Sequence, residues 1–215
     1  MGRLSWRNSL ASQKSAVTSF GYSALRYSVQ WLRYEHAHYV HFQAGPSAEH
    51  VRSALRYFMV SRNFKGIKEP AEAEFIRSKL ARIAARRRLE PAKSVTDLAD
   101  AWRSRFMRLN VSAASKMLWL FDRDTFVIYD SRAVKGLRQL GVSSGLSGYG
   151  DYVAAWMNRY AHYNQQIDKV VRRLPQLLDF MPPIAVPVSE YRQMVREDWF
   201  RKRVFDIYLW ELGAK

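Results

Sequence analysis

Apolar residues recur along most of the chain every three to four positions, which is the pattern of amphipathic helices. Strand-like alternation of apolar and polar residues is not apparent. The sequence therefore predicts an all-α fold. Prolines, glycines and capping residues divide it into helices that we expect over 14–43, 48–62, 70–88, 95–108, 113–121, 131–140, 151–179, 189–196 and 198–212.

Several of these boundaries carry specific signals. Ser47 is a candidate cap for the second helix, and Pro70 suits the first turn of the third, where its missing N–H has no partner to lose. We expect Pro91 to end that segment and the capping box Ser94-Val95-Thr96-Asp97 to open the next helix. Breaks are expected near Gly21 in the first stretch and near Pro175 in the long helix over 151–179.

Composition narrows the class of protein. With 215 residues, 48% of them hydrophobic, the chain can form a single domain over 1–215, which can be two-lobed with a cleft near 109–140. No run of about 18 apolar residues is present, so we expect no membrane partner. The absence of cysteine excludes disulfides, zinc fingers, iron–sulfur clusters and thiol catalysis. We expect a cytoplasmic, nucleoid-associated monomer without a cofactor.

Charge is the unusual feature of this composition. Lys and Arg total 35 against 19 Asp and Glu, which gives a net charge of +16. Such a positive chain favours a polyanionic partner, and the predominance of arginine favours phosphate recognition. DNA is the partner we expect, with RNA, an acidic protein and anionic lipid as alternatives. The cations gather at two places that can contact the DNA backbone or form solvated faces: Arg82, Arg86, Arg87 and Arg88, and Arg196, Arg201, Lys202 and Arg203.

The most informative stretch runs from residue 109 to residue 140. A lysine, Lys116, lies in the first turns of an apolar helix, and an aspartate, Asp130, stands at the cap of the next helix. This arrangement resembles the helix–hairpin–helix superfamily of DNA glycosylases, in particular its 8-oxoguanine-glycosylase-like branch. That branch has a catalytic Lys opening one helix and a catalytic Asp capping the next within a Val-Asp-Thr-His-Val-like motif. Here the motif reads Tyr129-Asp130-Ser131-Arg132-Ala133-Val134.

The resemblance implies roles for the residues of this stretch. Asp130 would stabilise the charge that develops at C1′ as the glycosidic bond breaks, and Lys116 would attack C1′ and form a Schiff base. Leu109 through Lys116 occupies the place of the superfamily hairpin but lacks its glycines, so small Ser112 and Ser115 would allow a DNA phosphate to approach. Trp119 would border the base pocket, and Ser131 and Arg132 would contact phosphate or the flipped base.

Each residue also has a structural interpretation. Asp130 can be a helix cap alone, and Lys116 a solvated lysine.

The function predicted is excision of a damaged or modified base, in DNA repair or in defence against foreign DNA. A non-catalytic basic helical protein that binds DNA or RNA is the alternative. His36, His38 and His41 are better suited to packing than to a metal, so no metal site is expected. Asp206, within an apolar helix, is expected to pair with Arg203.

Overall fold

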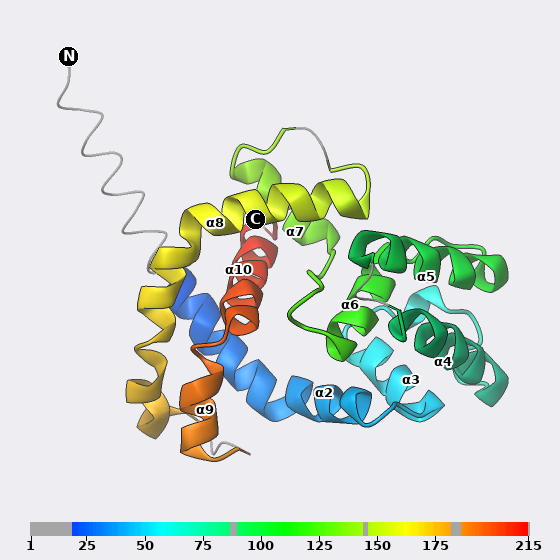
Figure 1. The fold of residues 1–215 in the computed structure, drawn as a ribbon, viewed down its shortest axis with the longest axis horizontal. Coiled ribbons are helices and arrows are strands. Elements are labelled where there is room, and N and C mark those ends of the chain that lie inside the picture. Colours follow the sequence, from blue (N-terminus) through cyan, green and yellow to red (C-terminus); the bar gives the residue numbers. More distant parts are fainter. Residues whose placement is uncertain (1–18, 87–89, 144–145, 182–185, 215) are drawn as a thin grey trace.

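The computed structural model describes residues 19–86, 90–143, 146–181 and 186–214, and this part of the chain contains helices and turns but no strand. The predicted all-α class is therefore confirmed (Figure 1). Residues 19–30 form a helix that continues through a π-helical turn, Trp31–Glu35, into α2. The elements that follow are α2 (His36–Gln43), α3 (Ala48–Tyr57), α4 (Pro70–Ala84), α5 (Pro91–Phe106), α6 (Val111–Phe121), α7 (Ser131–Gln139), α8 (Tyr149–Val171), α9 (Val188–Met194) and α10 (Asp198–Leu212), with 3₁₀ turns at Ser61–Asn63 and Leu174–Phe180.

The helix starts predicted at Ser47 and Pro70 are confirmed, and the one predicted at Ser94 is wrong. Ser47 caps α3 in a reciprocal box with His50, and Pro70 occupies the first turn of α4. Pro91 does not end a segment but begins α5, and Ser94 lies buried inside that helix instead of capping it. Proline is tolerated both after a helix and in a first turn, so its position alone does not separate the two readings.

The break expected near Gly21 lies elsewhere, whereas the break expected near Pro175 is confirmed. The helix over 19–30 passes Gly21 without interruption, and the irregularity falls at the π-helical turn Trp31–Glu35 instead. The long helix α8 ends at Val171, and Pro175 belongs to the 3₁₀ turn that follows it. Pro175 therefore lies beyond the α-helix, where its missing N–H costs no helical hydrogen bond.

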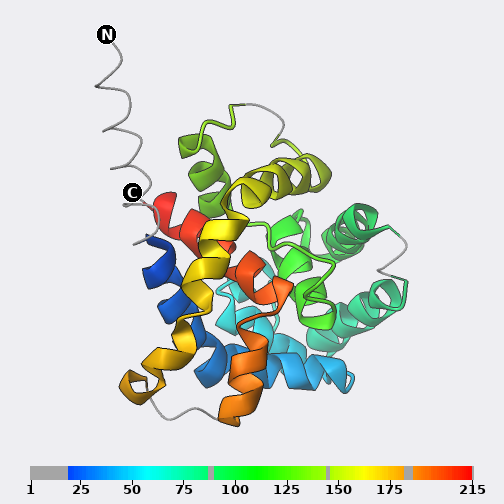
Figure 2. The ribbon, with the colours of Figure 1, turned by 60° about the vertical axis from the view of Figure 1, so that its left-hand side comes forward.

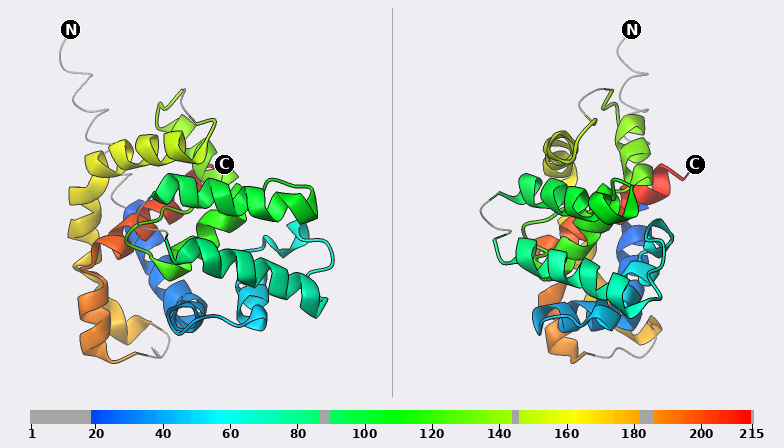
Figure 3. Two further views of the ribbon diagram at one scale, coloured as in Figure 1. Left: turned by 45° about the vertical axis from the view of Figure 1, so that its right-hand side comes forward. Right: turned by 90° about the vertical axis from the view of Figure 1, so that its right-hand side faces the viewer.

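The helices form two groups that meet around α6 and α10. Helices α3, α4, α5 and α6 pack on one another, while α7, α8 and α10 form the second group (Figures 1 and 3). The helix over 19–30 joins the second group, where the Ser23 hydroxyl donates to Glu211 of α10. Figure 2 shows this helix running beside α10. Helix α2 continues from it and packs against α3 and α6, so one long helical stretch connects both groups.

A cluster of buried aromatic side chains fills the region behind α6. The rings of Trp31, Trp119 and Trp199 contact one another, with centroids 4.8 to 6.5 Å apart. The Arg123 guanidinium lies 3.7 Å from the Trp199 ring centroid and 4.1 Å from that of Tyr39, where a cation is attracted to the ring faces.

Helices α7 and α10 approach each other more closely than side chains would permit. Both contact points are glycines, Gly136 on α7 and Gly213 at the end of α10. A Cβ on Gly136 would overlap the carbonyl oxygen of Leu209, and one on Gly213 would overlap that of Arg132. The pair of glycines therefore fixes α7, and with it Asp130 at its N-cap, against α10.

Candidate active site

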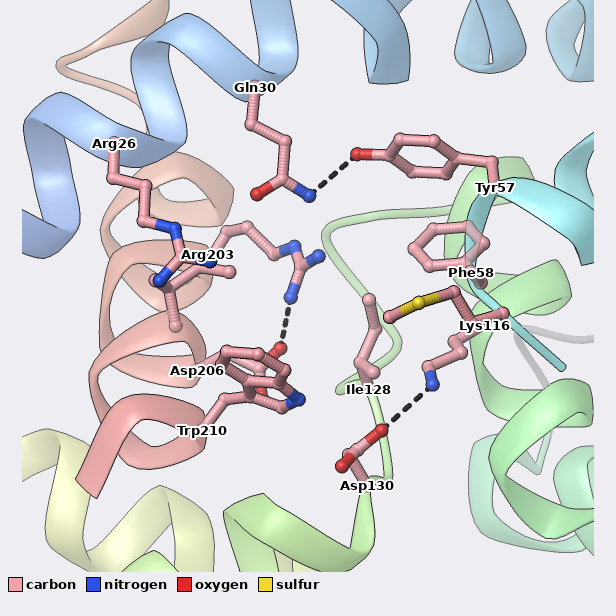
Figure 4. A pocket seen from close by; sticks show the side chains of 12 residues that line it. Arg26, Gln30, Tyr57, Phe58, Lys116, Ile128, Asp130, Arg203, Asp206 and Trp210 are labelled. Atoms are coloured by element: carbon pink, nitrogen blue, oxygen red, sulfur yellow. Dashed lines mark hydrogen bonds and ion pairs between the residues drawn. The ribbon is translucent and has the colours of Figure 1, made fainter. Parts of the chain in front are cut away.

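A pocket of about 160 Å³ opens between the two helix groups. Its walls come from the helix over 19–30, the end of α3, α6, the segment before α7, and α10 (Figure 4). Both polar and apolar side chains line it, among them Gln30, Phe58, Lys116, Ile128, Asp130 and Trp210. A concave site with a few convergent polar groups is the usual form of a ligand-binding pocket.

Lys116 and Asp130 meet in this pocket. The Lys116 Nζ lies 2.9 Å from Asp130 Oδ2, and the two side chains are only 8% and 20% exposed. The same ammonium is 5.9 Å from the centroid of the Phe58 ring. Burying two charges is costly unless they pair, so the pair and the aromatic ring together make the placement tolerable.

Asp130 is held in position by the start of α7. It is the N-cap of that helix, and its Oδ1 accepts a hydrogen bond of 3.0 Å from the backbone N–H of Arg132. This bond uses one carboxylate oxygen for capping and leaves the other for Lys116. The capping role and the pocket role are therefore compatible, and the same side chain fulfils both.

The segment that leads into Asp130 is tied to its surroundings by side chains. Ser115, the residue before Lys116, accepts a hydrogen bond of 2.9 Å from the backbone N–H of Tyr129, the residue before Asp130. The hydroxyl of Tyr149 bonds to the backbone N–H and carbonyl of Val127, and that of Tyr152 donates to the carbonyl of Ile128. The Lys116 and Asp130 side chains are therefore aligned by their own neighbours in sequence.

Of the predicted hairpin, Leu109 through Lys116, only Leu109 and Asn110 lie in the connection between α5 and α6, whereas residues 111–116 form the first turns of α6. We use the term hairpin below for the connection over residues 107–110. Met107 closes α5 in a left-handed conformation with φ of 52°, and Asn110 occupies the N-cap position of α6. The hairpin side chains Met107 and Leu109 point into solvent and are 85% and 50% exposed. Ser112, in the first turn of α6, offers its carbonyl to the Ser115 hydroxyl. Lys116 thus follows an exposed, apolar hairpin by little more than one helical turn.

A second group of charges forms another part of the pocket wall, where Arg203 and Asp206 are among the lining residues. Arg203 is buried between Glu35 and Asp206, at 3.3 Å from Glu35 Oε2 and in direct contact with Asp206 Oδ2. The predicted pairing of Arg203 with Asp206 is therefore confirmed. Glu35 also accepts hydrogen bonds from the hydroxyls of Tyr27 and Tyr57. Burial raises the pKa of Asp206 to about 6, against the lowering effect of Arg203.

The outer edge of the pocket carries two arginines around one indole. The Arg132 guanidinium lies 4.3 Å from the Trp210 ring centroid, and that of Arg26 lies 5.4 Å from it. Arg26 is also paired with Glu211 at 2.8 Å. Arg132, a candidate DNA contact, is thus an exposed cation at the pocket edge, and Ser131 beside it is exposed as well.

Two further candidate residues, Trp119 and Arg203, are buried. Trp119 is buried in the aromatic cluster and is not among the residues that line the 160 Å³ pocket, because it points from α6 toward Trp31 and Trp199. Arg203 is buried and fully paired, so the expectation that it contacts a DNA phosphate at the surface is wrong.

The two predicted arginine clusters contain cations that are paired with acids, which the sequence did not indicate. Arg201 pairs with Asp168 and Asp198, and Lys202 pairs with Asp198, so the 196–203 cluster is largely neutralised by nearby acids. Arg86 is exposed and lies 4.0 Å from Asp97. Arg87 and Arg88 lie outside the described residues.

Sequence reasoning did not single out Gln30, Glu35, Tyr57 or Trp210 as site residues. A signal was present for Glu35, which is the sole acid between positions 19 and 43 in an aromatic-rich helix. The same kind of signal, an acid among apolar residues, did identify Asp206. Gln30, Tyr57 and Trp210 carried no such signal, because polar and aromatic residues are common on half-buried helix faces.

In the described part of the chain, no group of three or more His, Asp or Glu side chains is arranged to hold a metal ion. Two of the histidines, His41 and His50, stack on each other with centroids 3.8 Å apart, and His36 packs against Trp31. Among the helices of these residues, none combines the length and apolarity needed to cross a membrane.

Comparison of the chain with models of protein families, with curated proteins and with solved structures found no match. The pocket around Lys116 and Asp130 is therefore the basis on which a function can be assigned. It combines a buried amine, a carboxylate within hydrogen-bond distance and a cavity of about 160 Å³.

Proposed function

We propose that this protein is a DNA glycosylase-like enzyme that flips a damaged or modified base out of DNA and excises it. Lys116 is the nucleophile and Asp130 is the carboxylate that stabilises the transition state. One observation carries the proposal: side chains 14 positions apart in sequence meet at 2.9 Å in the wall of a pocket. That pairing joins the two residue types that base excision through a Schiff base uses, an amine nucleophile and a carboxylate.

The geometry supports a definite sequence of steps. Lys116 passes a proton to water, so that Asp130 stays a carboxylate, and the neutral Lys116 amine forms a bond to C1′ while the bond from C1′ to the base breaks. The departing base takes up a proton, and the sugar ring opens to give a Schiff base on Lys116. The Asp130 carboxylate lies beside the position where positive charge develops on the sugar, so it lowers the energy of that state.

Three further features fit this activity. Chemistry on a base requires that the base leave the duplex and enter a pocket, and the cavity of about 160 Å³ is such a space. The net charge of +16 favours binding to phosphates, and exposed cations such as Arg132 lie at the pocket edge. The exposed hairpin over residues 107–110 directly precedes α6, the helix that carries Lys116, and its Arg108 can contact the DNA backbone.

Release of free base from modified duplexes tests the proposal. Duplexes that each carry one oxidised, alkylated or deaminated base are incubated with the protein, and the free base is measured by mass spectrometry. We expect release from at least one duplex by the wild type and loss of release in Lys116→Met and Asp130→Asn. Lys135→Met, which removes an exposed lysine of α7, is the matched control and should retain release.

The charge also favours the alternative, a non-catalytic protein that binds DNA or RNA. It predicts salt-sensitive binding with no base released from any duplex. Undiminished release by both Lys116→Met and Asp130→Asn would instead remove the pair from the chemistry.

A further inference from the structure

The Gln30 side chain reaches the pocket from the helix over 19–30, on the side opposite Asp130 (Figure 4). Its amide Nε2 donates a hydrogen bond of 2.6 Å to the hydroxyl of Tyr57. The orientation of a glutamine amide matters, because one end donates hydrogen bonds and the other accepts them. Which end faces the pocket decides which ligand edge can bind there.

The hydrogen bonds around Tyr57 fix that orientation. Tyr57 donates its single hydroxyl hydrogen to Glu35 Oε2, at 2.9 Å. Glu35 is fully buried against Arg203 and acts as an acceptor toward Arg203 and both tyrosines. Since the hydroxyl hydrogen is already used, the Tyr57 oxygen can only accept from Gln30. Burial raises the pKa of Tyr57, so the hydroxyl keeps the proton on which this order depends.

With Nε2 held by Tyr57, the other end of the amide, Oε1, faces the pocket (Figure 4). No described residue donates a hydrogen bond to it. Phe58, Ile128 and Ile207 supply apolar surface around the same space. The pocket thus offers a planar ligand an apolar lining with one acceptor whose direction is set by a buried ionic network.

We infer that Gln30 determines specificity by accepting a hydrogen bond from a ring N–H on the edge of the bound base. Bases with a lactam edge, in which N–H stands beside a carbonyl, fit this acceptor. A base that presents a bare ring nitrogen would bring two acceptors together and leave both without water, which is unfavourable. The inference rests on the proposed function only in taking the ligand to be a base.

Binding of small bases tests the inference without requiring any excision. We would measure dissociation constants for 9-methylhypoxanthine, 9-methylpurine and 1,9-dimethylhypoxanthine by calorimetry or NMR titration. The 9-methyl group occupies the position of the sugar, so N1–H is the sole N–H of the first compound, and the other two lack it. The third compound keeps the carbonyl. One hydrogen bond corresponds to a preference of about three- to tenfold for 9-methylhypoxanthine in the wild type.

Two variants separate a specificity role from a merely structural one. Gln30→Met removes the acceptor and should bring the preference close to one. Tyr57→Phe leaves Gln30 in place but frees its amide to turn, so the preference should fall although no acceptor has been lost. The matched control is Tyr22→Phe, which removes the hydroxyl of an exposed tyrosine and should keep the wild-type preference. Thermal unfolding checks that each variant folds. If Gln30→Met does not fold, the preference measured with Tyr57→Phe tests the inference by itself.

The outcomes distinguish this inference from the proposed function. Equal affinity of the wild type for all three compounds, no binding of 9-methylhypoxanthine, or a preference retained in both Gln30→Met and Tyr57→Phe would overturn the inference. A clear preference in a protein that releases no base from DNA would leave the inference standing and reject the glycosylase proposal. Base release without any preference would do the reverse.

Discussion

At the scale of single residues, five ionisable side chains share the buried region around the pocket. Lys116 and Arg203 carry positive charge, while Asp130, Asp206 and Glu35 carry negative charge when ionised. Asp206 lies near Lys116 and Asp130 as well as Arg203, and it has one carboxylate oxygen without a hydrogen-bond partner. An acid in such surroundings holds its proton to higher pH, which balances the charges of the group.

This acid should make stability depend on pH. The pKa of Asp206 is about 6 in the folded protein and about 3.9 in an unfolded chain. Between these values the folded state keeps a proton that the unfolded chain releases. The contribution of Asp206 to the unfolding free energy is therefore complete below about pH 4 and is lost as the pH rises through 6. The unfolding free energy of the wild type minus that of Asp206→Asn should fall between pH 4 and 7.5, by at most about 3 kcal/mol. Chemical denaturation measures this difference, and an identical value at both pH values would contradict the assignment.

Removing the buried Arg203 should lower the unfolding free energy far more than removing an exposed arginine. Arg203→Met leaves Glu35 buried with no cation beside it, which typically costs about 3–5 kcal/mol of unfolding free energy. Arg138→Met, an equivalent change at an exposed arginine of α7, should cost little. Urea denaturation of both variants compares them. A loss for Arg203→Met no larger than that of the control would show that the ionic group does not support the fold.

Residue types by themselves indicate part of this site. Aspartate is a preferred N-cap residue, so the sequence predicts Asp130 as a cap, and the fold confirms it. The pairing of Arg203 with Asp206 follows from an acid within an apolar helix. The position of Gln30 opposite Asp130 could not be predicted, because it depends on how helices far apart in sequence pack.

At the scale of elements, the site depends on how closely α7 lies against α10. Gly136 and Gly213 allow the two backbones to touch, and α7 carries Asp130 at its N-cap. On another side of the pocket, the π-helical turn Trp31–Glu35 ends at the buried Glu35. Glu35 contacts Tyr57 and Arg203, which both line the pocket. π-helical turns are rare in proteins, and those that occur are often found at functional sites.

Alanine substitutions at two helical glycines test the importance of this contact. Gly136→Ala forces α7 away from Leu209 and should lower the unfolding free energy by about 1–3 kcal/mol. Gly21→Ala is the matched control, because its Cβ would meet no atom within 4 Å and alanine favours the helix by about 1 kcal/mol. Thermal unfolding should therefore move in opposite directions for the two variants. Equal shifts would argue against a tight α7–α10 contact.

Helix identity can be read from the sequence far better than helix boundaries. Apolar periodicity predicts each of the major helices, since the buried faces of these helices repeat every three to four residues. The sequence misplaces Pro91 because the same residue serves after one helix and in the first turn of the next. The π-helical turn Trp31–Glu35 is not predicted, because the sequence carries no signal for it that we recognise.

At the scale of the whole molecule, only some of the positively charged side chains are exposed and able to contact DNA. Arg201 and Lys202 are paired with acids, and Arg203 is buried, so the 196–203 cluster has few free cations. Arg108 in the hairpin and Arg132 at the pocket edge are exposed. The surface that we expect to meet DNA is therefore the one that includes the hairpin and the pocket mouth.

Salt dependence of DNA binding tests this distribution. Each lost phosphate contact reduces the slope of log K against log salt by about one. Arg108→Gln should show this reduction, whereas Arg201→Gln should leave the slope unchanged because Arg201 is held by Asp168 and Asp198. Fluorescence anisotropy with a duplex between about 50 and 200 mM salt gives both slopes. A larger effect of Arg201→Gln would place the DNA surface elsewhere.

Borohydride trapping on a duplex with an abasic site tests the central claim most directly, because it needs no knowledge of the target base. A Schiff base between Lys116 and C1′ is reduced to a stable covalent adduct, which appears on a denaturing gel. We predict an adduct for the wild type and for Lys135→Met, and none for Lys116→Met. Absence of an adduct with the wild type, or an equal adduct with Lys116→Met, would contradict the assignment of Lys116 as the nucleophile.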